Sequence, residues 1–221
     1  MIQRVWYDGV DVTESWRNSP YPGAVNTDIN SLHTIKAELV SVDEPYPFYY
    51  FFAYSGIHDL DLSDLDVSWV TDFTCCLYGL GELTSCNLDG FDTSNGEIFD
   101  GFLGNCFGNN GYTPDVSKLN TSKGKSFKSC FDDWGGTTLD IRGWDFSSCE
   151  SGGLERMFIG FEDVTKIYMP EKFVDFQIDK SPFFWTESSG TLYYPEESQT
   201  QYEDSYFIQY AEEAGYNCVA Q

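Results

Sequence analysis

Histidine is scarce in this sequence of 221 residues. The histidines are His33 and His58, and neither lies in a recognisable catalytic motif. A hydrolase with a histidine base needs a nucleophile and an orienting group beside it, so we expect both to be surface or packing residues. The 36 acidic residues make close carboxylate pairs inevitable, so such pairs say little about glycosidase chemistry. We predict no catalytic residue.

Basic side chains are also few. The chain has 12 lysines and arginines against 36 aspartates and glutamates, which gives a formal net charge of −24. Such a surface repels nucleic acid and anionic membranes, so neither is expected as a partner. The acidity has two interpretations. It keeps the protein soluble, or it attracts a basic or cation-rich partner.

No C-x-x-C pair occurs among the seven cysteines, and the adjacent Cys75 and Cys76 are unsuited to a shared zinc site. We therefore expect no metal and no cofactor. Cys76, Cys86 and Cys130 fall on repeated apolar positions, where a free cysteine behaves as a small hydrophobic residue. Buried free thiols indicate folding in a reducing compartment.

The sequence also lacks the pattern of a leader or a membrane span. Residues 1–20 have no basic start followed by an apolar core, so we expect no signal peptide. The most apolar run, residues 46–54, is too short to cross a bilayer. These features favour folding in a reducing cytoplasm over display at a cell surface. Display on a virion is compatible with them.

The dominant feature of the chain is a repeat. Aligning Asp61, Asn87, Asp115 and Asp140 brings four segments into one register, at spacings of 26, 28 and 25 residues. The segments read DLSDLDVS, NLDGFDTS, DVSKLNTS and DIRGWDFS. Each has apolar residues at its second and fifth positions, Asp or Asn at its sixth and Ser at its eighth. A fixed period of this length is the signature of a solenoid.

Each repeat combines two periodicities. Its start alternates apolar and polar residues, as in Leu60-Asp61-Leu62, which predicts a short strand. In the first three repeats an aromatic residue such as Phe73 is followed by an apolar pair three and four positions later, which predicts a short helical turn. Stacking such units predicts an α/β solenoid with one parallel sheet along one side.

This plan is that of leucine-rich repeats. The sequence motifs LDLSDLDVS, NLDGFDTSN and KLNTSK resemble the BspA-like surface repeats, also found in mycoplasma lipoproteins, and the resemblance covers about residues 57–173. The copy is degenerate, because Cys86 replaces a core leucine and residues 108–113 are an insertion. The lipid-anchor cysteine that many members carry is not seen near the start of this sequence. The resemblance implies adhesion or recognition at a surface.

Residues 1–56 precede the repeats and differ from them. Asp8-Gly9 between two β-prone runs predicts a hairpin, and residues 34–42 predict a further strand. Residues 48–54 (FYYFFAY) form another β-prone run, and we interpret the whole region as an N-terminal β cap over the first repeat. The alternative is a docking interface, which would allow a homo-oligomer. Its residues would be Phe48, Tyr50, Phe51 and Phe52.

The solenoid is expected to span residues 57–173, as four repeats and a half repeat at 162–173. Residues 174–221 predict a C-terminal cap. In it, a strand ended by Pro195 precedes a tyrosine-bearing helix over residues 201–214. The terminal segment of BspA-like arrays has the same order of strand and closing helix.

Two sets of residues are candidate binding sites. The first is a polar stripe that strand pairing would space roughly 4.8 Å apart. It comprises Asp61, Asn87, Asp115 and Asp140, and it is either a solvated face or a calcium site. The second comprises aromatic loop tips, since insertions in solenoids often decorate one face. These tips are Phe107, Tyr112 and Trp134. A further series is expected to accept backbone hydrogen bonds at turns: Asp66, Asp92, Asn120 and Asp145.

These patterns predict a non-catalytic binding module that recognises a protein or a glycan on a surface. The alternative is a virion structural or decoration protein, such as a phage tail or capsid component, whose partners are neighbouring subunits. An assembly protein would bury the aromatic residues of 48–54 or the C-terminal tyrosines against another subunit. A recognition module would be monomeric and would expose its aromatic loop tips.

Overall fold

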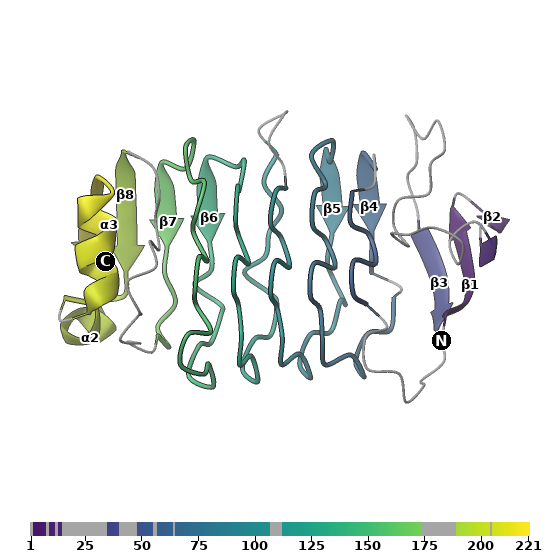
Figure 1. The fold of residues 1–221 in the computed structure, drawn as a ribbon, viewed down its shortest axis with the longest axis horizontal. Helices are drawn as coiled ribbons and strands as arrows, with labels where there is room; N and C mark the ends of the chain where they lie inside the picture. The colour runs from purple at the N-terminus through teal and green to yellow at the C-terminus, as the bar shows by residue number, and fades with distance from the viewer. Residues whose placement is uncertain are drawn as a thin grey trace.

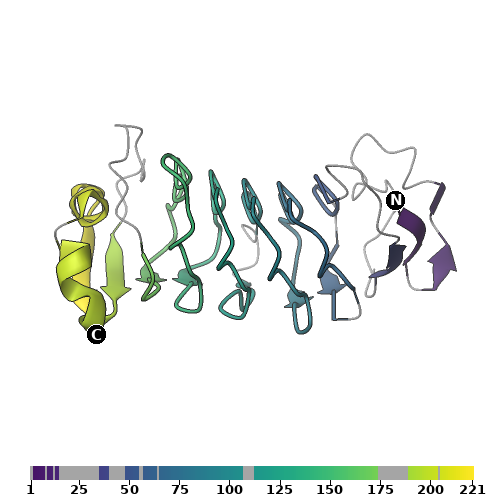
Figure 2. The same ribbon diagram turned by 90° about the horizontal axis from the view of Figure 1, so that it is seen from below.

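The chain forms a β-solenoid of about five turns with few helices. The computed structural model describes residues 2–7, 9–11, 13–14, 35–39, 48–54, 57–63, 65–106, 112–173, 189–203 and 205–221. Figure 1 shows the turns stacked along one long axis, and Figure 2 shows each turn as a flattened loop with its strand on one side. The predicted solenoid is therefore confirmed, although its turns are not built from a strand and a helix.

Short parallel strands line one side of the solenoid. They form a two-stranded sheet, β4-β5, and a four-stranded sheet in the order β6-β7-β8-β9. The prediction of one continuous sheet is wrong, because the third repeat separates the two. The strands are β4 (Asp59–Asp61), β5 (Ser85–Asn87), β6 (Thr138–Asp140), β7 (Lys166–Tyr168), β8 (Gly190–Tyr194) and β9 (Tyr216–Ala220).

Two residues of the third repeat explain the break between the sheets. The Tyr112 hydroxyl accepts a hydrogen bond from the Cys86 amide (2.7 Å) and donates one to the Cys86 carbonyl (3.3 Å). The Tyr112 side chain thus forms the hydrogen bonds that a neighbouring strand would otherwise make to the Cys86 backbone. Pro114 follows at the strand position and has no N–H for a ladder. Residues 112–116, all described, therefore cross the strand side without forming a strand.

The opposite side of each turn is a series of tight turns instead of the predicted helix. We call residues 48–54, 73–79, 99–105, 127–133 and 153–160 the turn ribbon. Alternate amides of the ribbon bond in two directions. The Cys76 amide donates to the Phe73 carbonyl of its own segment (3.0 Å), whereas the Cys75 amide donates to the Asp100 carbonyl of the next (2.8 Å). These bonds link all five segments of the ribbon without a break.

Left-handed backbone at non-glycine residues keeps the ribbon from being a helix. Cys75, Ser129 and Asp133 have φ of 52°, 51° and 52°. Such a conformation costs an L-residue about 1–2 kcal/mol, which the bonds to both neighbouring segments offset. The apolar pair of the repeat is still buried, with Cys76 and Leu77 at 0% and 1% exposure. Helical spacing thus predicted which side chains are buried but not the backbone that buries them.

Aromatic rings run through the core from one turn to the next. Phe73 stacks on Phe99 with ring centroids 5.4 Å apart, and Phe99 stacks on Phe127 at 5.2 Å. Phe48 continues the row, 6.2 Å from Phe73. All four side chains are fully buried. The repeated aromatic position therefore forms one axis of the core.

The N-terminal region contains a three-stranded antiparallel sheet in the order β2-β1-β3. Its strands are β1 (Ile2–Tyr7), β2 (Val10–Asp11) and β3 (Ile35–Leu39). The predicted hairpin and third strand are both confirmed, since β1 pairs in antiparallel fashion with β2 and also with β3. Figure 1 places this sheet at the end of the solenoid beyond β4.

Residues 48–54 do not form the predicted strand. They make turns, and the amides of Tyr50, Phe52 and Tyr54 donate to the next segment of the turn ribbon. Phe48, Phe51 and Phe52 have the same spacing as Phe73 and its apolar pair, so 48–54 is a further copy of the repeat's second half.

The C-terminal region follows its predicted order, with two additions. β8 ends at Tyr194, directly before Pro195, as expected. The predicted helix is interrupted near Ser205, whose hydroxyl accepts from the Ile208 amide and caps a separate helix. The sequence patterns also missed β9, which pairs in parallel with β8. The helical elements are η1 (Glu196–Ser198), α2 (Gln199–Glu203) and α3 (Tyr206–Glu213).

Candidate functional site

The predicted polar stripe is not a row of unbonded carboxylates. Asp61 and Asn87 are partners on β4 and β5, and the Asn87 amide donates to the Asp61 carboxylate (3.1 Å). Asp115 lies on the turn without a strand, where it accepts from the Ser117 amide (3.1 Å) and hydroxyl (2.6 Å). Asp140 binds Arg142 and lies beside Tyr168 of β7. Local hydrogen bonds and one arginine therefore hold the stripe.

The second acidic series lies at turns, as the sequence predicted. The Ser68 hydroxyl and amide donate to the Asp66 carboxylate at 2.7 and 3.1 Å and lower its pKa. The same turn recurs one repeat later each time, with Ser94, Ser122 and Ser147 as donors. The acceptors there are Asp92, Asn120 and Asp145.

The aromatic loop tips do not form the predicted exposed surface. Trp134 is 1% exposed and packs edge-on against Phe131, with ring centroids 5.5 Å apart. Tyr112 is half-buried because its hydroxyl bonds the Cys86 backbone. Phe107 lies outside the described residues. The prediction is therefore wrong for Trp134, since its indole completes the core behind the turn ribbon.

The predicted docking interface is also internal for the most part. Phe48, Phe51 and Phe52 are at most 1% exposed, and Tyr50 is half-buried. They pack in the first turn of the same chain because their spacing matches the core positions of the repeat. The outward side chains of this segment are Tyr49 and Tyr54, which are 48% and 49% exposed.

The cysteines are free, and five of the seven are buried. Burial raises the pKa of the Cys106 and Cys149 thiols to about 12, and that of Cys76 and Cys130 well above its ordinary value. These thiols stay protonated at neutral pH, which makes them poor nucleophiles and poor metal ligands.

Within the described ranges, no group of three or more His, Cys, Asp and Glu side chains is placed to hold a metal ion. The same ranges contain no helix of the length and apolarity needed to cross a bilayer.

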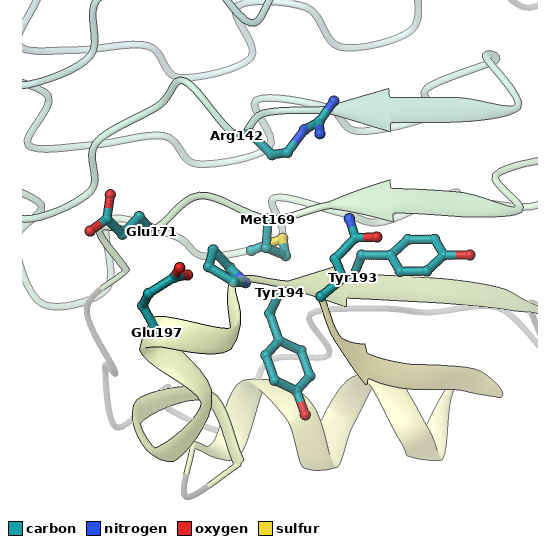
Figure 3. A pocket seen from close by; sticks show the side chains of 8 residues that line it. Arg142, Met169, Glu171, Tyr193, Tyr194 and Glu197 are labelled. Carbon is teal, nitrogen blue, oxygen red and sulfur yellow. The ribbon is translucent and has the colours of Figure 1, made fainter.

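A hollow of the described surface lies beyond the carboxyl ends of β6, β7 and β8. It has a volume of about 550 Å³. Parallel strands end on the same edge of a sheet, so residues directly after the strands meet here although they are far apart in sequence. Figure 3 shows Arg142 on one side of the hollow and Glu171 and Glu197 on the other. The lining is completed by Met169, Tyr193, Tyr194, Pro195 and Gln221.

A second hollow of about 400 Å³ adjoins the first and shares Arg142 and Glu171 with it. It extends toward the third repeat through residues 118–122 and 143–145, and Lys172 also lines it. We call the two hollows together the C-terminal groove. The groove crosses several turns along the strand side of the solenoid.

The Arg142 side chain of this groove is held in position by two neighbouring residues. Its guanidinium forms a two-pronged ion pair with Asp140, with the closest approach at 2.5 Å. It also lies over the Tyr168 ring at 4.9 Å, and Tyr168 stacks on Tyr193 at 4.8 Å. Burial raises the pKa of the Asp140 carboxyl, but the hydrogen bonds from Arg142 outweigh it and the net pKa is lowered.

Sequence patterns missed most residues of the C-terminal groove. Of the predicted stripe, Asp140 touches it only through Arg142. One signal was present: Arg142 stands where the other repeats have Ser63, Asp89 and Ser117 at the third position of the repeated segment. A lone cation at an outward repeat position of an acidic chain is such a signal. Glu197 and Gln221 belong to segments outside the repeat, so no sequence pattern pointed to them.

Comparison with protein-family models, with curated proteins and with solved structures found no match.

Proposed function

We propose that this chain is a non-catalytic binding module that recognises a protein or a glycan on a surface. The observation that carries the proposal is the C-terminal groove, an open hollow lined by arginine, carboxylates and an amide. Ligand pockets are commonly concave and about 300–1,000 Å³ in volume. The buried thiols with raised pKa argue against cysteine chemistry.

The solenoid is proposed to be a degenerate BspA-like leucine-rich repeat. The second and fifth positions of the repeated segment are buried in every copy, which is the pattern such repeats require. The buried residues are Leu62, Leu65, Leu88, Phe91, Val116, Leu119, Ile141 and Trp144. The N-terminal sheet and the helices after β8 lie at opposite ends of the stack, where terminal repeats need caps.

A second candidate is a virion structural or decoration protein. It is favoured by large exposed aromatic side chains near both ends of the solenoid, Tyr49 and Tyr54 at one end and Tyr206 at the other. Exposed aromatic residues are enriched at protein–protein interfaces. The buried free thiols agree with assembly in a reducing cytoplasm.

Light scattering combined with a surface-binding assay distinguishes the two candidates. For a recognition module we expect a monomer whose fluorescent form binds intact cells saturably and loses that binding on Arg142→Ala. An oligomer that dissociates on Tyr49→Ser and Tyr54→Ser, with no cell binding, would support the assembly protein. A monomer that binds none of a broad panel of bacterial and animal cells would refute the recognition module.

A further inference from the structure

The charge of the C-terminal groove differs from that of the whole chain. Three cations and three carboxylates line it, whereas the chain carries 12 basic and 36 acidic residues. The cations are Lys118, Arg142 and Lys172, and the carboxylates are Asp145, Glu171 and Glu197. Each of these cations is paired with a carboxylate, Lys118 with Asp89, Arg142 with Asp140 and Lys172 with Asp145, so the groove offers an anionic ligand no unpaired cation. The lining therefore suits a ligand without net charge better than an anionic one.

Arg142 supplies hydrogen-bond donors in a fixed position. Its bonds to Asp140 use the Nε–H and one N–H of Nη2, so three of the five guanidinium N–H groups have no partner among the described residues. Asp140 and the Tyr168 ring restrict the side chain, although it remains 59% exposed. A ligand that bonds this guanidinium therefore loses little entropy in ordering it.

The opposite wall supplies acceptors. The carboxylates of Glu171 and Glu197 and the side-chain amide of Gln221 make no hydrogen bond to another described residue. Their backbones are nevertheless held. The Glu171 carbonyl accepts from the Ser198 hydroxyl (3.1 Å), and the Gln221 amide donates to the Tyr194 carbonyl (2.9 Å). The groove thus has unused donors on one side and unused acceptors on the other.

Apolar atoms lie between these polar groups. In the first hollow the half-buried Tyr193 and Pro195 present apolar surface, whereas Met169 there, and Leu119 and Trp144 in the second hollow, are at most 3% exposed. The two hollows meet at Arg142 and Glu171, so a ligand longer than one unit can contact both. Polar groups of both kinds around an apolar floor suit a chain of rings that present hydroxyl groups at their edges and C–H groups on their faces.

We propose that the C-terminal groove binds a neutral oligosaccharide, whose hydroxyl groups donate to Glu171 and Glu197 and accept from Arg142. The inference rests on the proposed recognition function and names its ligand class. It assigns Arg142 as the main donor, with Glu171 and Glu197 as acceptors.

The test starts with the purified full chain on an array of neutral and anionic oligosaccharides, and the strongest neutral ligand is then titrated by calorimetry. Loss of a charged hydrogen-bond donor weakens binding by about tenfold or more, so Arg142→Ala should show at least that loss. The Arg142→Lys variant should also bind weakly, because an ammonium lacks the planar fork of a guanidinium.

Lys128→Ala is the matched control. Lys128 belongs to the turn ribbon and pairs with Glu155 at 3.8 Å, so its removal should change affinity by less than about twofold. Circular dichroism confirms that each variant is folded.

Three outcomes overturn the inference. The first is no binding of any neutral oligosaccharide at a concentration of ~1 mM. The second is binding that Arg142→Ala leaves unchanged. The third is binding of a hexalysine peptide, lost on Glu171→Gln with Glu197→Gln, while no sugar binds.

Periodate oxidation of the target cells separates this inference from the proposed function. Periodate destroys vicinal diols of cell-surface glycans. Binding that requires Arg142 and disappears after periodate supports both proposals. Binding that requires Arg142 and survives periodate keeps the recognition function and excludes saccharides that carry vicinal diols as the ligand. Absence of binding to untreated cells would refute the proposed recognition function.

Discussion

The two long sides of this solenoid are held together in different ways. On the strand side, short strands pair in parallel, and the pairing is interrupted at the third repeat, where the Tyr112 hydroxyl bonds the Cys86 backbone and Pro114 has no N–H to donate. On the other side, the turn ribbon bonds every segment to the next from 48–54 to 153–160. The continuous ladder is therefore made of left-handed turns, and the interrupted one is made of regular strands.

This difference separates two tasks. The turn ribbon covers the stacked phenylalanines and supports the stack, so its side chains are constrained by the core. The strand side tolerates a break and also a lone arginine at an outward position. Because parallel strands end on a common edge, that side also carries the C-terminal groove. The proposed binding surface lies on the side that bears less of the stacking.

The largest expected effect comes from the ring stack beneath the turn ribbon. Phe99 lies between Phe73 and Phe127 and is fully buried. Phe99→Ala should lower the unfolding free energy by about 3–5 kcal/mol, because it removes the ring contacts with Phe73 and Phe127 and leaves a cavity. Urea denaturation measures the loss. Tyr206→Ala, at a side chain 47% exposed, is the control and should cost far less. A loss below about 1 kcal/mol for Phe99→Ala would mean that the stack does not support the turns.

A smaller effect is expected at the break on the strand side. Tyr112→Phe removes the hydroxyl that bonds the Cys86 amide and carbonyl, and so leaves partly buried backbone groups unsatisfied. We expect a loss of about 1–3 kcal/mol, again from urea denaturation. Tyr206→Phe is the matched control and should have no effect. Equal stability of the Tyr112 variant and the wild type would show that water replaces the hydroxyl and that its bonds to the Cys86 backbone do not stabilise the fold.

The backbone strain of the turn ribbon can be tested by relieving it at one residue. Ser129 has φ of 51°, which glycine adopts without steric cost. Ser129→Gly should therefore raise the unfolding free energy by about 0.5–1 kcal/mol, after the extra chain entropy of glycine is subtracted. Ser151→Gly, at a residue without positive φ, is the control and should be slightly destabilising. Destabilisation by Ser129→Gly would indicate that the serine side chain, not the backbone, matters there.

The smallest effect concerns the acidic turns. The hydroxyl and amide of Ser94 lower the pKa of Asp92 below 3.8, its value in an unfolded chain. This contribution to stability is complete above pH 3.8 and is lost as the pH falls through the folded pKa. Asp92→Asn keeps the turn, as Asn120 does naturally, but does not titrate. The stability advantage of wild type over the variant should shrink as the pH falls from 6 toward 2.5, about the range over which a lowered carboxyl titrates. An advantage independent of pH would contradict it.

Sequence patterns predicted much of the fold for local reasons. The acidic turns at Asp66 and Asp145 depend on a donor two residues away, so the pattern D-x-S is enough to identify them. β8 ends directly before Pro195, which has no N–H for a strand ladder. The helix prediction failed at residues such as Cys75, because a helix and a ribbon of turns can bury the same spacing of apolar residues. The strand predicted at 48–54 does not form, because Phe48, Phe51 and Phe52 have the spacing of the repeat's core positions and their burial in a turn outweighs the β-propensity of the segment.

The candidate site was less predictable than the fold. Trp134 and Tyr112 stand in loops by sequence, yet packing against Phe131 and the Cys86 backbone takes them inward. The acidic stripe is predicted as a row, but its members bond locally instead of with each other, apart from Asp61 and Asn87. Side chains at loop positions are placed by neighbours from other turns, which no single segment specifies.

The sequence by itself determined the period, the buried positions of each repeat and the acidic turns, because each rests on spacing within one segment. Only the tertiary structure decided which neighbour each backbone group bonds, and so the turn ribbon, the break at the third repeat and the added strand β9. It also brought Arg142, Glu171 and Glu197 to one groove. Those residues come from three successive segments, and stacking the turns is what makes them neighbours.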